Sequence, residues 1–142
     1  DISIPPEVKT VRIGYFENKA RYVNPLLSPQ LTDKLRQKIN NQTRLTQIQG
    51  DDAHYDISGV ITGYTVTTAA ISQQQAATNR LTVTVKLSFR NNLDPDKNEE
   101  ADVSRNFDFS ANLSLQQAEA QLTESIINNM ADEIFNRIFS QW

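Results

Sequence analysis

The stretch YFENKARYVNPLLSPQLTDKL, residues 15–35, holds the end of one element, a crossing and the start of another. From Val8 into this stretch, apolar residues alternate with polar or small ones, which is the period of a strand with one buried face. Asn24-Pro25 marks a turn. Ser28-Pro29 is typical of a helix N-cap followed by proline at the first helical position. The sequence therefore predicts a strand over residues 8–16, a loop, and a helix capped by Ser28.

Two helices are indicated by apolar residues that recur about once per helical turn. The first carries Leu31, Leu35 and Ile39 on one stripe. The second follows Ser114 and Gln117, which form a capping box in which each side chain satisfies a backbone N–H of the first turn. The stripe of this second helix comprises Leu115, Ala118, Leu122, Ile126, Met130, Ile134 and Ile138.

The clearest strand is predicted over residues 80–90, where apolar and polar residues alternate strictly. Its apolar residues share one face, and its polar residues share the other. A second long strand is predicted over residues 56–67. Gly59 and Gly63 lie two strand periods apart on it, which places them on one face and indicates close packing by another element or a strong twist. The polar face of the first strand consists of Arg80, Thr82, Thr84, Lys86, Ser88 and Arg90.

Shorter strands are predicted over residues 45–49 and 103–109, with a polar loop over residues 68–79 and a charged loop over residues 91–100. The order of the main elements is then β-α-β-β-β-α. Strands that cluster in mid-chain and are joined by hairpin-length loops predict an α+β fold. We expect a two-layer sandwich, with both helices on one face of a mixed, mostly antiparallel sheet of four strands, or of five with the short one.

Length and composition set broad limits on the protein. A chain of 142 residues fits a single domain over residues 1–142, in which Pro5-Pro6 favours an extended N-terminal segment over residues 1–7. The absence of cysteine excludes disulfides and cysteine-type zinc sites. The net charge of −3 argues against a nucleic-acid partner. No apolar run approaches the roughly 20 residues of a membrane-spanning helix.

The sequence predicts neither catalysis nor a cofactor. His54 lies among carboxylates, but the ligand set of a zinc site is missing, so we interpret its surroundings as a solvated turn. The loop over residues 94–100 resembles the start of a calcium-binding loop, yet Glu99 stands at the glycine position and Arg105 at the position of the bidentate glutamate. A serine or threonine nucleophile would have only His54 as an imidazole base. We therefore predict that the protein is not an enzyme and needs no metal.

The polar face of the strand over residues 80–90 is the candidate binding surface. Its hydroxyl groups and three cations could contact a polar or anionic partner. The residues alone favour a solvated sheet face whose charges discourage edge pairing, and they leave the binding interpretation open. The candidate binding residues are Arg80, Thr82, Thr84, Lys86 and Arg90.

Four motifs follow the predicted elements along nearly the whole chain. They are Tyr15-Phe16-x-Asn18-x-Ala20-x-x-Val23-Asn24-Pro25-x-Leu27-Ser28-x-x-Leu31-Thr32-Asp33-x-Leu35, Ile57-x-Gly59-x-Ile61-x-Gly63-Tyr64, Ala77-x-Asn79-Arg80-Leu81-Thr82-x-x-Val85, and Asp132-x-Ile134-Phe135-Asn136 with the terminal Trp142. Together these motifs resemble the LptE family of lipopolysaccharide-assembly lipoproteins in its Bacteroidetes form. The fold that the resemblance implies, two helices packed on a four-stranded sheet, agrees with the fold predicted from the residues.

The resemblance implies a non-catalytic lipoprotein on the periplasmic side of the outer membrane. Such a protein plugs the β-barrel of LptD, helps it assemble, and takes part in inserting lipopolysaccharide into the outer leaflet. The resemblance also implies a lipid anchor on an N-terminal cysteine, a residue that this sequence does not contain. Arg80, Lys86 and Arg90 would then form part of a local basic patch toward the barrel or lipopolysaccharide. The alternative is a soluble periplasmic module that holds a small ligand between helices and sheet.

Overall fold

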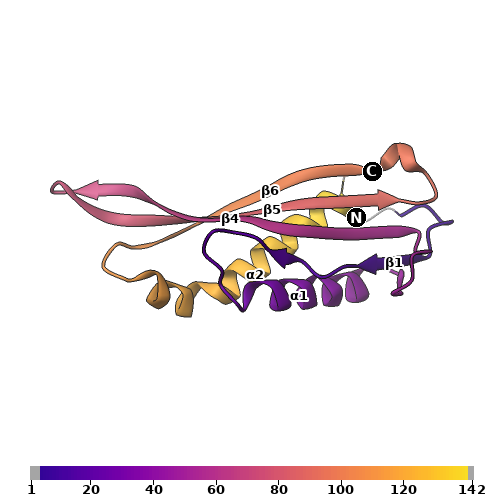
Figure 1. Ribbon diagram of the computed structural model, residues 1–142, viewed down its shortest axis with the longest axis horizontal. Coiled ribbons are helices and arrows are strands. Elements are labelled where there is room, and N and C mark those ends of the chain that lie inside the picture. The colour runs from indigo at the N-terminus through magenta and orange to yellow at the C-terminus, as the bar shows by residue number, and fades with distance from the viewer. Residues whose placement is uncertain (1–3, 141–142) are drawn as a thin grey trace.

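The computed structural model describes residues 4–140, which form one sheet and two long helices. The strand order is β3-β1-β4-β5-β6, and β2 pairs with β4 beyond the end of β1. Both helices lie against one face of the sheet, the inner face, and within residues 4–140 no helix covers the outer face (Figure 1). In chain order the elements are β1 (Thr10–Ile13), β2 (Glu17–Asn18), α1 (Leu27–Gln42), β3 (Thr46–Gln47), β4 (Tyr55–Ser72), β5 (Gln75–Asn91), a 3-10 helix (Pro95–Lys97), β6 (Glu99–Ser110) and α2 (Leu115–Phe139).

The sheet is mixed in the way that the element order predicts. β1 runs parallel to both β3 and β4, whereas β4 with β5 and β5 with β6 are antiparallel. Parallel neighbours need a crossover connection, and α1 lies in the connection between β1 and β4. The predicted α+β fold class is confirmed, with the short strand over residues 45–49 present as β3.

The hydrophobic core fills the space between the inner face and the helices. The predicted apolar face of β5 is buried from Leu81 to Phe89, and the stripe on α1 is buried in the same core. The predicted capping box of α2 is present: Ser114 Oγ accepts from the Gln117 backbone N–H at 3.1 Å, and Gln117 Oε1 accepts from the Ser114 N–H at 2.9 Å. From the predicted stripe of α2, the buried residues are Ala118, Ile126, Met130, Ile134 and Ile138.

The start of α1 differs from its prediction. The helix begins at Leu27, and Leu26 at the N-cap makes no side-chain cap. Asn24 supplies the acceptors instead, because its Oδ1 accepts from the Leu26 N–H and its carbonyl accepts from the Leu27 N–H, both at 3.1 Å. Ser28 therefore lies inside the helix rather than at its cap, and it is only 5% exposed.

The edge strand β6 is tied to α2 by charged side chains on the inner face. Arg105 of β6 forms an ion pair with Glu133 of α2. Arg137 of α2 reaches back to Glu99 of β6, with 2.7 Å between Arg137 Nη2 and Glu99 Oε1. Charges on the inward side of an edge strand discourage pairing with a further strand.

The predicted polar loop over residues 68–79 is wrong, because this segment is the far end of a β-hairpin. β4 continues to Ser72 and β5 begins at Gln75, so that only Gln73 and Gln74 form the turn. The hairpin extends beyond the helices at one end of the molecule (Figure 1). Polar composition suggested a loop, but threonine and isoleucine favour strands, and pairing between the two arms continues up to the turn.

The turn of this hairpin holds two glutamines in the left-handed region, with φ of 54° at Gln73 and 65° at Gln74. Asparagine and glycine tolerate these angles better than glutamine does. The double substitution Gln73→Asn and Gln74→Gly should therefore stabilise the hairpin by about 1 kcal/mol. Hydrogen exchange at the amides of residues 66–80 should slow by about fivefold, since 1.4 kcal/mol corresponds to tenfold. Unchanged exchange would show that the turn does not limit local opening.

Gly59 and Gly63 do not share a face, contrary to prediction. Between the pairs Ile61↔Val85 and Gly63↔Thr84, β4 contains one extra residue, so the strand bulges there. Gly59 faces inward, where a Cβ would lie 2.6 Å from the ring of Phe16, whereas Gly63 lies beside Thr84 on the outer face. The predicted close packing is confirmed at Gly59 alone.

The N-terminal segment contains a turn where an extended segment was expected. The Val8 N–H donates to the Pro5 carbonyl at 3.0 Å, and residues 1–3 of the predicted segment lie outside the described residues. Within residues 4–140, neither helix has the length and apolar character needed to cross a bilayer.

Candidate functional site

The outer face of the sheet carries all five predicted binding residues. β5 lies between β4 and β6, so its outward side chains occupy the middle of this face. They alternate with buried neighbours such as Val83 and Val85, which points them away from the helices. The residues concerned are Arg80, Thr82, Thr84, Lys86 and Arg90.

Two cations of this face, Arg80 and Lys86, are paired with carboxylates on β6. Arg80 contacts Asp108 through two hydrogen bonds of 2.8 and 3.1 Å. This contact lowers the pKa of Asp108, because the hydrogen bond from Arg80 favours the charged carboxylate. Lys86 Nζ lies 4.0 Å from Glu100. Both pairs are exposed, so they contribute little to stability, but they leave this part of the outer face close to electrical balance.

Neutral hydrogen bonds fill the space between the two ion pairs. Thr82 Oγ1 donates to Asn106 Oδ1 at 2.8 Å, and the hydroxyl groups of Thr84 and Ser104 lie 2.7 Å apart. Arg80 and Lys86 are separated by about 20 Å along the strand at ~3.3 Å per residue. The outer face is therefore a balanced polar ladder rather than a concentrated basic patch, and binding by its five residues stays a prediction.

The projecting hairpin is a second functional candidate, and the sequence predicts a working surface at its tip around Gln73, although as the tip of a loop. Residues 65–79 contain no charged side chain. Val66 is 40% exposed and Ile71 is 70% exposed. An isolated two-stranded hairpin is only marginally stable in water, and an uncharged edge readily accepts a partner. The uncharged run of threonine, valine and isoleucine favours a strand in this segment, but the three consecutive glutamines led to the prediction of a loop.

A tyrosine–glutamate cluster joins β4 to α2 near the base of the hairpin. The hydroxyl of Tyr64 donates to Glu119 Oε2 at 2.5 Å, and that of Tyr22 donates to Glu119 Oε1 at 3.0 Å. The two tyrosine rings stack with their centroids 5.4 Å apart. Asn24 donates to the Tyr64 hydroxyl at 3.3 Å. The cluster fixes the loop before α1 against the sheet.

This cluster makes stability sensitive to alkaline pH. Burial, and then the hydrogen bond to Glu119, raise the pKa of Tyr64 above its ordinary value. An unfolded tyrosine ionises near pH 10, so the unfolded chain loses this proton first. The stabilisation is therefore complete below about pH 10 and is lost as pH rises further. Urea unfolding between pH 8 and pH 11 should show this fall, and Tyr64→Phe should show a smaller one. Equal slopes in the two proteins would contradict the assignment.

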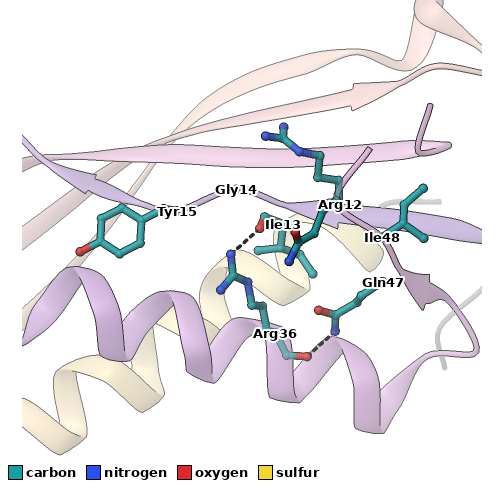
Figure 2. A pocket seen from close by; sticks show the side chains of 8 residues that line it. Arg12, Ile13, Gly14, Tyr15, Arg36, Gln47 and Ile48 are labelled. Carbon is teal, nitrogen blue, oxygen red and sulfur yellow. Dashed lines mark hydrogen bonds between the residues drawn. The ribbon is translucent and has the colours of Figure 1, made fainter. Parts of the chain in front are cut away.

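An open pocket of about 360 Å³ lies at the edge of β1, beside α1 (Figure 2). Arg36 of α1 donates to the Ile13 carbonyl at 2.9 Å, and Gln47 Nε2 donates to the Arg36 carbonyl at 2.7 Å. Arg12 lines the same pocket, but its guanidinium turns away from Arg36 (Figure 2) and lies 3.3 Å from Asp56. The guanidinium groups of Arg12 and Arg36 therefore do not point toward a common ligand position in this pocket.

The interior offers little room for a small ligand. Among the described residues, the pocket between α2 and the sheet beside Phe89 and Ile138 holds about 10 Å³, which is room for about one water. No group of three or more His, Cys, Asp or Glu residues within residues 4–140 is placed to hold a metal ion. His54 instead accepts a hydrogen bond at Nδ1 from the Lys9 N–H, at 2.9 Å. The packed core argues against a ligand held between helices and sheet.

Solved structures share this fold at low sequence identity. A minor lipoprotein from Acinetobacter baumannii is 16% identical, with 92% of each chain covered and a TM-score of 0.61. A hypothetical protein from Chlamydia trachomatis is 8% identical, with 92% of this chain and 95% of that chain covered and a TM-score of 0.61. The rare lipoprotein B from Shewanella oneidensis is 13% identical, with 89% and 92% covered and a TM-score of 0.57. At these identities the likeness shows the fold alone.

Comparison with curated proteins gives no match. Comparison with family models gives one that covers nearly all of the described chain. The model described as LptE, lipopolysaccharide-assembly, matches residues 8–138, from two residues before β1 to the last turn of α2. This chain therefore belongs to the LptE family of lipopolysaccharide-assembly proteins.

Proposed function

We propose that the protein is a non-catalytic lipoprotein of the outer membrane that fills the lumen of the LptD β-barrel from the periplasmic side. It helps that barrel assemble and supports the insertion of lipopolysaccharide into the outer leaflet, while an N-terminal lipid holds it at the membrane. Membership of the LptE family supports the role in lipopolysaccharide assembly. The outer face of the sheet is polar, and neither helix covers it (Figure 1). This observation supports the outer face as the surface that contacts the barrel.

The physical properties of the outer face suit a barrel lumen. The lumen of an outer-membrane barrel is polar, so a protein inside it needs hydrogen-bonding groups rather than an apolar surface. Arg80 is already paired with Asp108, and Thr84 with Ser104. Such groups lose less on leaving water than unpaired charges do. The core beneath them is solid, which gives this face a fixed shape.

Recovery of the full-length lipidated protein from its own outer membrane tests this proposal. We expect an LptD-type β-barrel to co-purify in comparable amount and to be identified by mass spectrometry. Recovery without any barrel would overturn the proposal. The triple variant Arg80→Ala, Lys86→Ala and Arg90→Ala should keep the fold, because these side chains lie on the outer face. Reduced recovery of the barrel with this variant supports the outer face as the contact, whereas unchanged recovery assigns the contact to another surface.

A further inference from the structure

One edge of β4 has no partner strand beyond the end of β2. On this side β4 pairs first with β1 and then with β2, and Asn18↔Ile61 is the last paired position. Beyond it, no strand within residues 4–140 pairs with β4 on this side, although β4 continues to Ser72. On the other side, β5 pairs with β4 as far as the turn. The open edge is therefore held in an extended conformation by the strand behind it.

The backbone groups of every second residue of β4 point toward this open edge. The Lys19 N–H donates to the Ile61 carbonyl at 2.9 Å, so the groups of Ile61 point away from its cross-strand partner Val85. Because β5 has no bulge over residues 79–85, this direction recurs at every second pair. The residues that share it are Tyr64, Val66 and Thr68, opposite Val83, Leu81 and Asn79. Tyr64 is buried, but the other two residues are exposed, so their N–H and C=O groups lie at the surface.

This edge lacks the side chains that keep strand edges from pairing. Charged residues and proline are the usual guards of an edge strand, and residues 62–72 contain neither. Bulges at Thr62 and Ala69 bound the open edge, so that residues 63–68 form its regular part. The opposite edge of the sheet is β6, which carries Glu100, Asp102, Arg105 and Asp108. The open edge of β4 is therefore the one that suits a short added strand.

We propose that an extended, uncharged segment of the barrel chain adds to this edge as a further strand. The inference rests on the proposed function, because it names the way in which that partner is held. The side chains of Thr65, Val66 and Thr67 are β-branched and suit a cross-strand neighbour. Arg80, opposite Thr67, is already paired with Asp108, so a charge on the added strand would find no partner there. Since the strands of a closed barrel pair on both sides, the segment comes from a loop or a terminal extension.

A second copy of this chain fits the open edge less well than an extended segment does. Two identical edges would pair in antiparallel fashion about a two-fold axis. With that axis at Val66, residues 71 and 72 of one copy would lie opposite residues 61 and 60 of the other. These positions are already taken by β2, which pairs at Val60 and Ile61. An extended segment without a projecting hairpin avoids this clash.

Proline substitution distinguishes the open edge of β4 from its paired side. Val66→Pro removes an N–H that points to the open edge, where proline is tolerated. Recovery of the barrel should fall at least about fivefold, as expected for one lost hydrogen bond, while the melting temperature of the isolated chain falls by no more than about 4 °C. Thr67→Pro removes an N–H that points toward β5 and should lower the melting temperature more. An equal or smaller fall with Thr67→Pro would overturn the assigned direction of these groups.

Two further variants separate the backbone from the side chains. Val66→Thr keeps the N–H and should reduce recovery less than Val66→Pro does. Thr68→Lys places a guarding charge on the exposed edge and should reduce recovery at least about fivefold without unfolding the chain. Gln121→Lys, at an exposed position of α2, is the matched control for the added charge and should leave recovery unchanged. Unchanged recovery with Val66→Pro or Thr68→Lys would overturn the inference, as would equal losses for the two Val66 variants.

Photo-cross-linking identifies the occupant of the edge directly. With benzoylphenylalanine in place of Thr68, the full-length protein in its own cells should cross-link to a loop or terminal segment of the barrel chain, located by mass spectrometry. A cross-link to a second copy, to another protein or to no protein would overturn the inference. Barrel recovery by the unaltered chain without this cross-link would sink the inference alone, whereas no recovery of any barrel would sink the proposed function.

Discussion

Replacement of Gly59 by alanine is expected to lower the free energy of unfolding by about 2–3 kcal/mol, as overpacking of a core does. A Cβ at this position would lie 2.6 and 2.9 Å from two ring carbons of Phe16 and 3.2 Å from the carbonyl oxygen of Lys86. The Phe16 ring is fully buried and cannot swing into solvent. The β5 backbone cannot retreat without loosening its pairing with β4. Urea unfolding of both proteins gives the comparison.

Gly63→Ala is the matched control for this prediction. Its Cβ would lie 3.2 Å from Cβ and Oγ1 of Thr84 on the outer face, which is a few tenths of an ångström too close and much less severe than the contact at Gly59. We expect a loss below about 1 kcal/mol, as for most surface substitutions. Phe16→Leu combined with Gly59→Ala should recover part of the loss in a double-mutant cycle. Equal losses for the two glycine variants would show that Phe16 does not occupy the space at Gly59.

Shortening of the projecting hairpin is expected to reduce recovery of the barrel at least tenfold, while the domain stays folded. The design replaces residues 71–77 by Asn-Gly, which joins Ala70 to its cross-strand partner Thr78 through a two-residue turn. Every paired position between β5 and β6 is kept, since Thr78↔Ser110 is the last of them. Besides the paired positions Ile71↔Ala76 and Ser72↔Gln75 within the deleted end, the deletion removes the backbone hydrogen bond from the Ala111 N–H to the Ala77 carbonyl.

The physical reason for this large effect is the composition of the hairpin. Its end carries no charged side chain and exposes Ile71. Contact with a partner therefore buries apolar surface without burying an unpaired charge. Recovery from the outer membrane and the melting temperature should be measured on the same variant. The single substitution Ile71→Ser keeps the length of the hairpin and should give an intermediate loss. Full recovery of the barrel with the shortened hairpin would exclude this segment from the contact.

Most of the fold could be predicted from the periodicity of apolar residues along the chain. The alternation along β5 and the long stripe on α2 each repeat over many residues, so both can be recognised without knowing which strands pair. The bulge itself depends on pairing between β4 and β5, which is not encoded in the spacing of the glycines. For this reason the common face of Gly59 and Gly63 was predicted wrongly.

The candidate site was harder to predict than the fold. The polar face of β5 follows from alternation, but its electrical balance depends on carboxylates of β6 such as Asp108, which come close only when the strands align. The same holds for the contact between Tyr64 and Glu119, which are 55 residues apart in the chain. Ser28 was predicted as a cap because Ser-Pro is a strong local signal. Leu26 stands at the cap instead, and Asn24 accepts from the N–H groups of Leu26 and Leu27.

The crossover between β1 and β4 has a consequence for the order in which the sheet forms. Arg12 and Asp56, cross-strand neighbours, are separated by 44 residues, whereas β4, β5 and β6 follow one another directly. Closing a long loop loses more chain entropy than closing a hairpin, and non-local pairing is slow. In pulsed hydrogen exchange during refolding, amides of β5 should gain protection before those of β1, and simultaneous protection would contradict this order. The N-terminal strand would then be the last part of the sheet to become ordered.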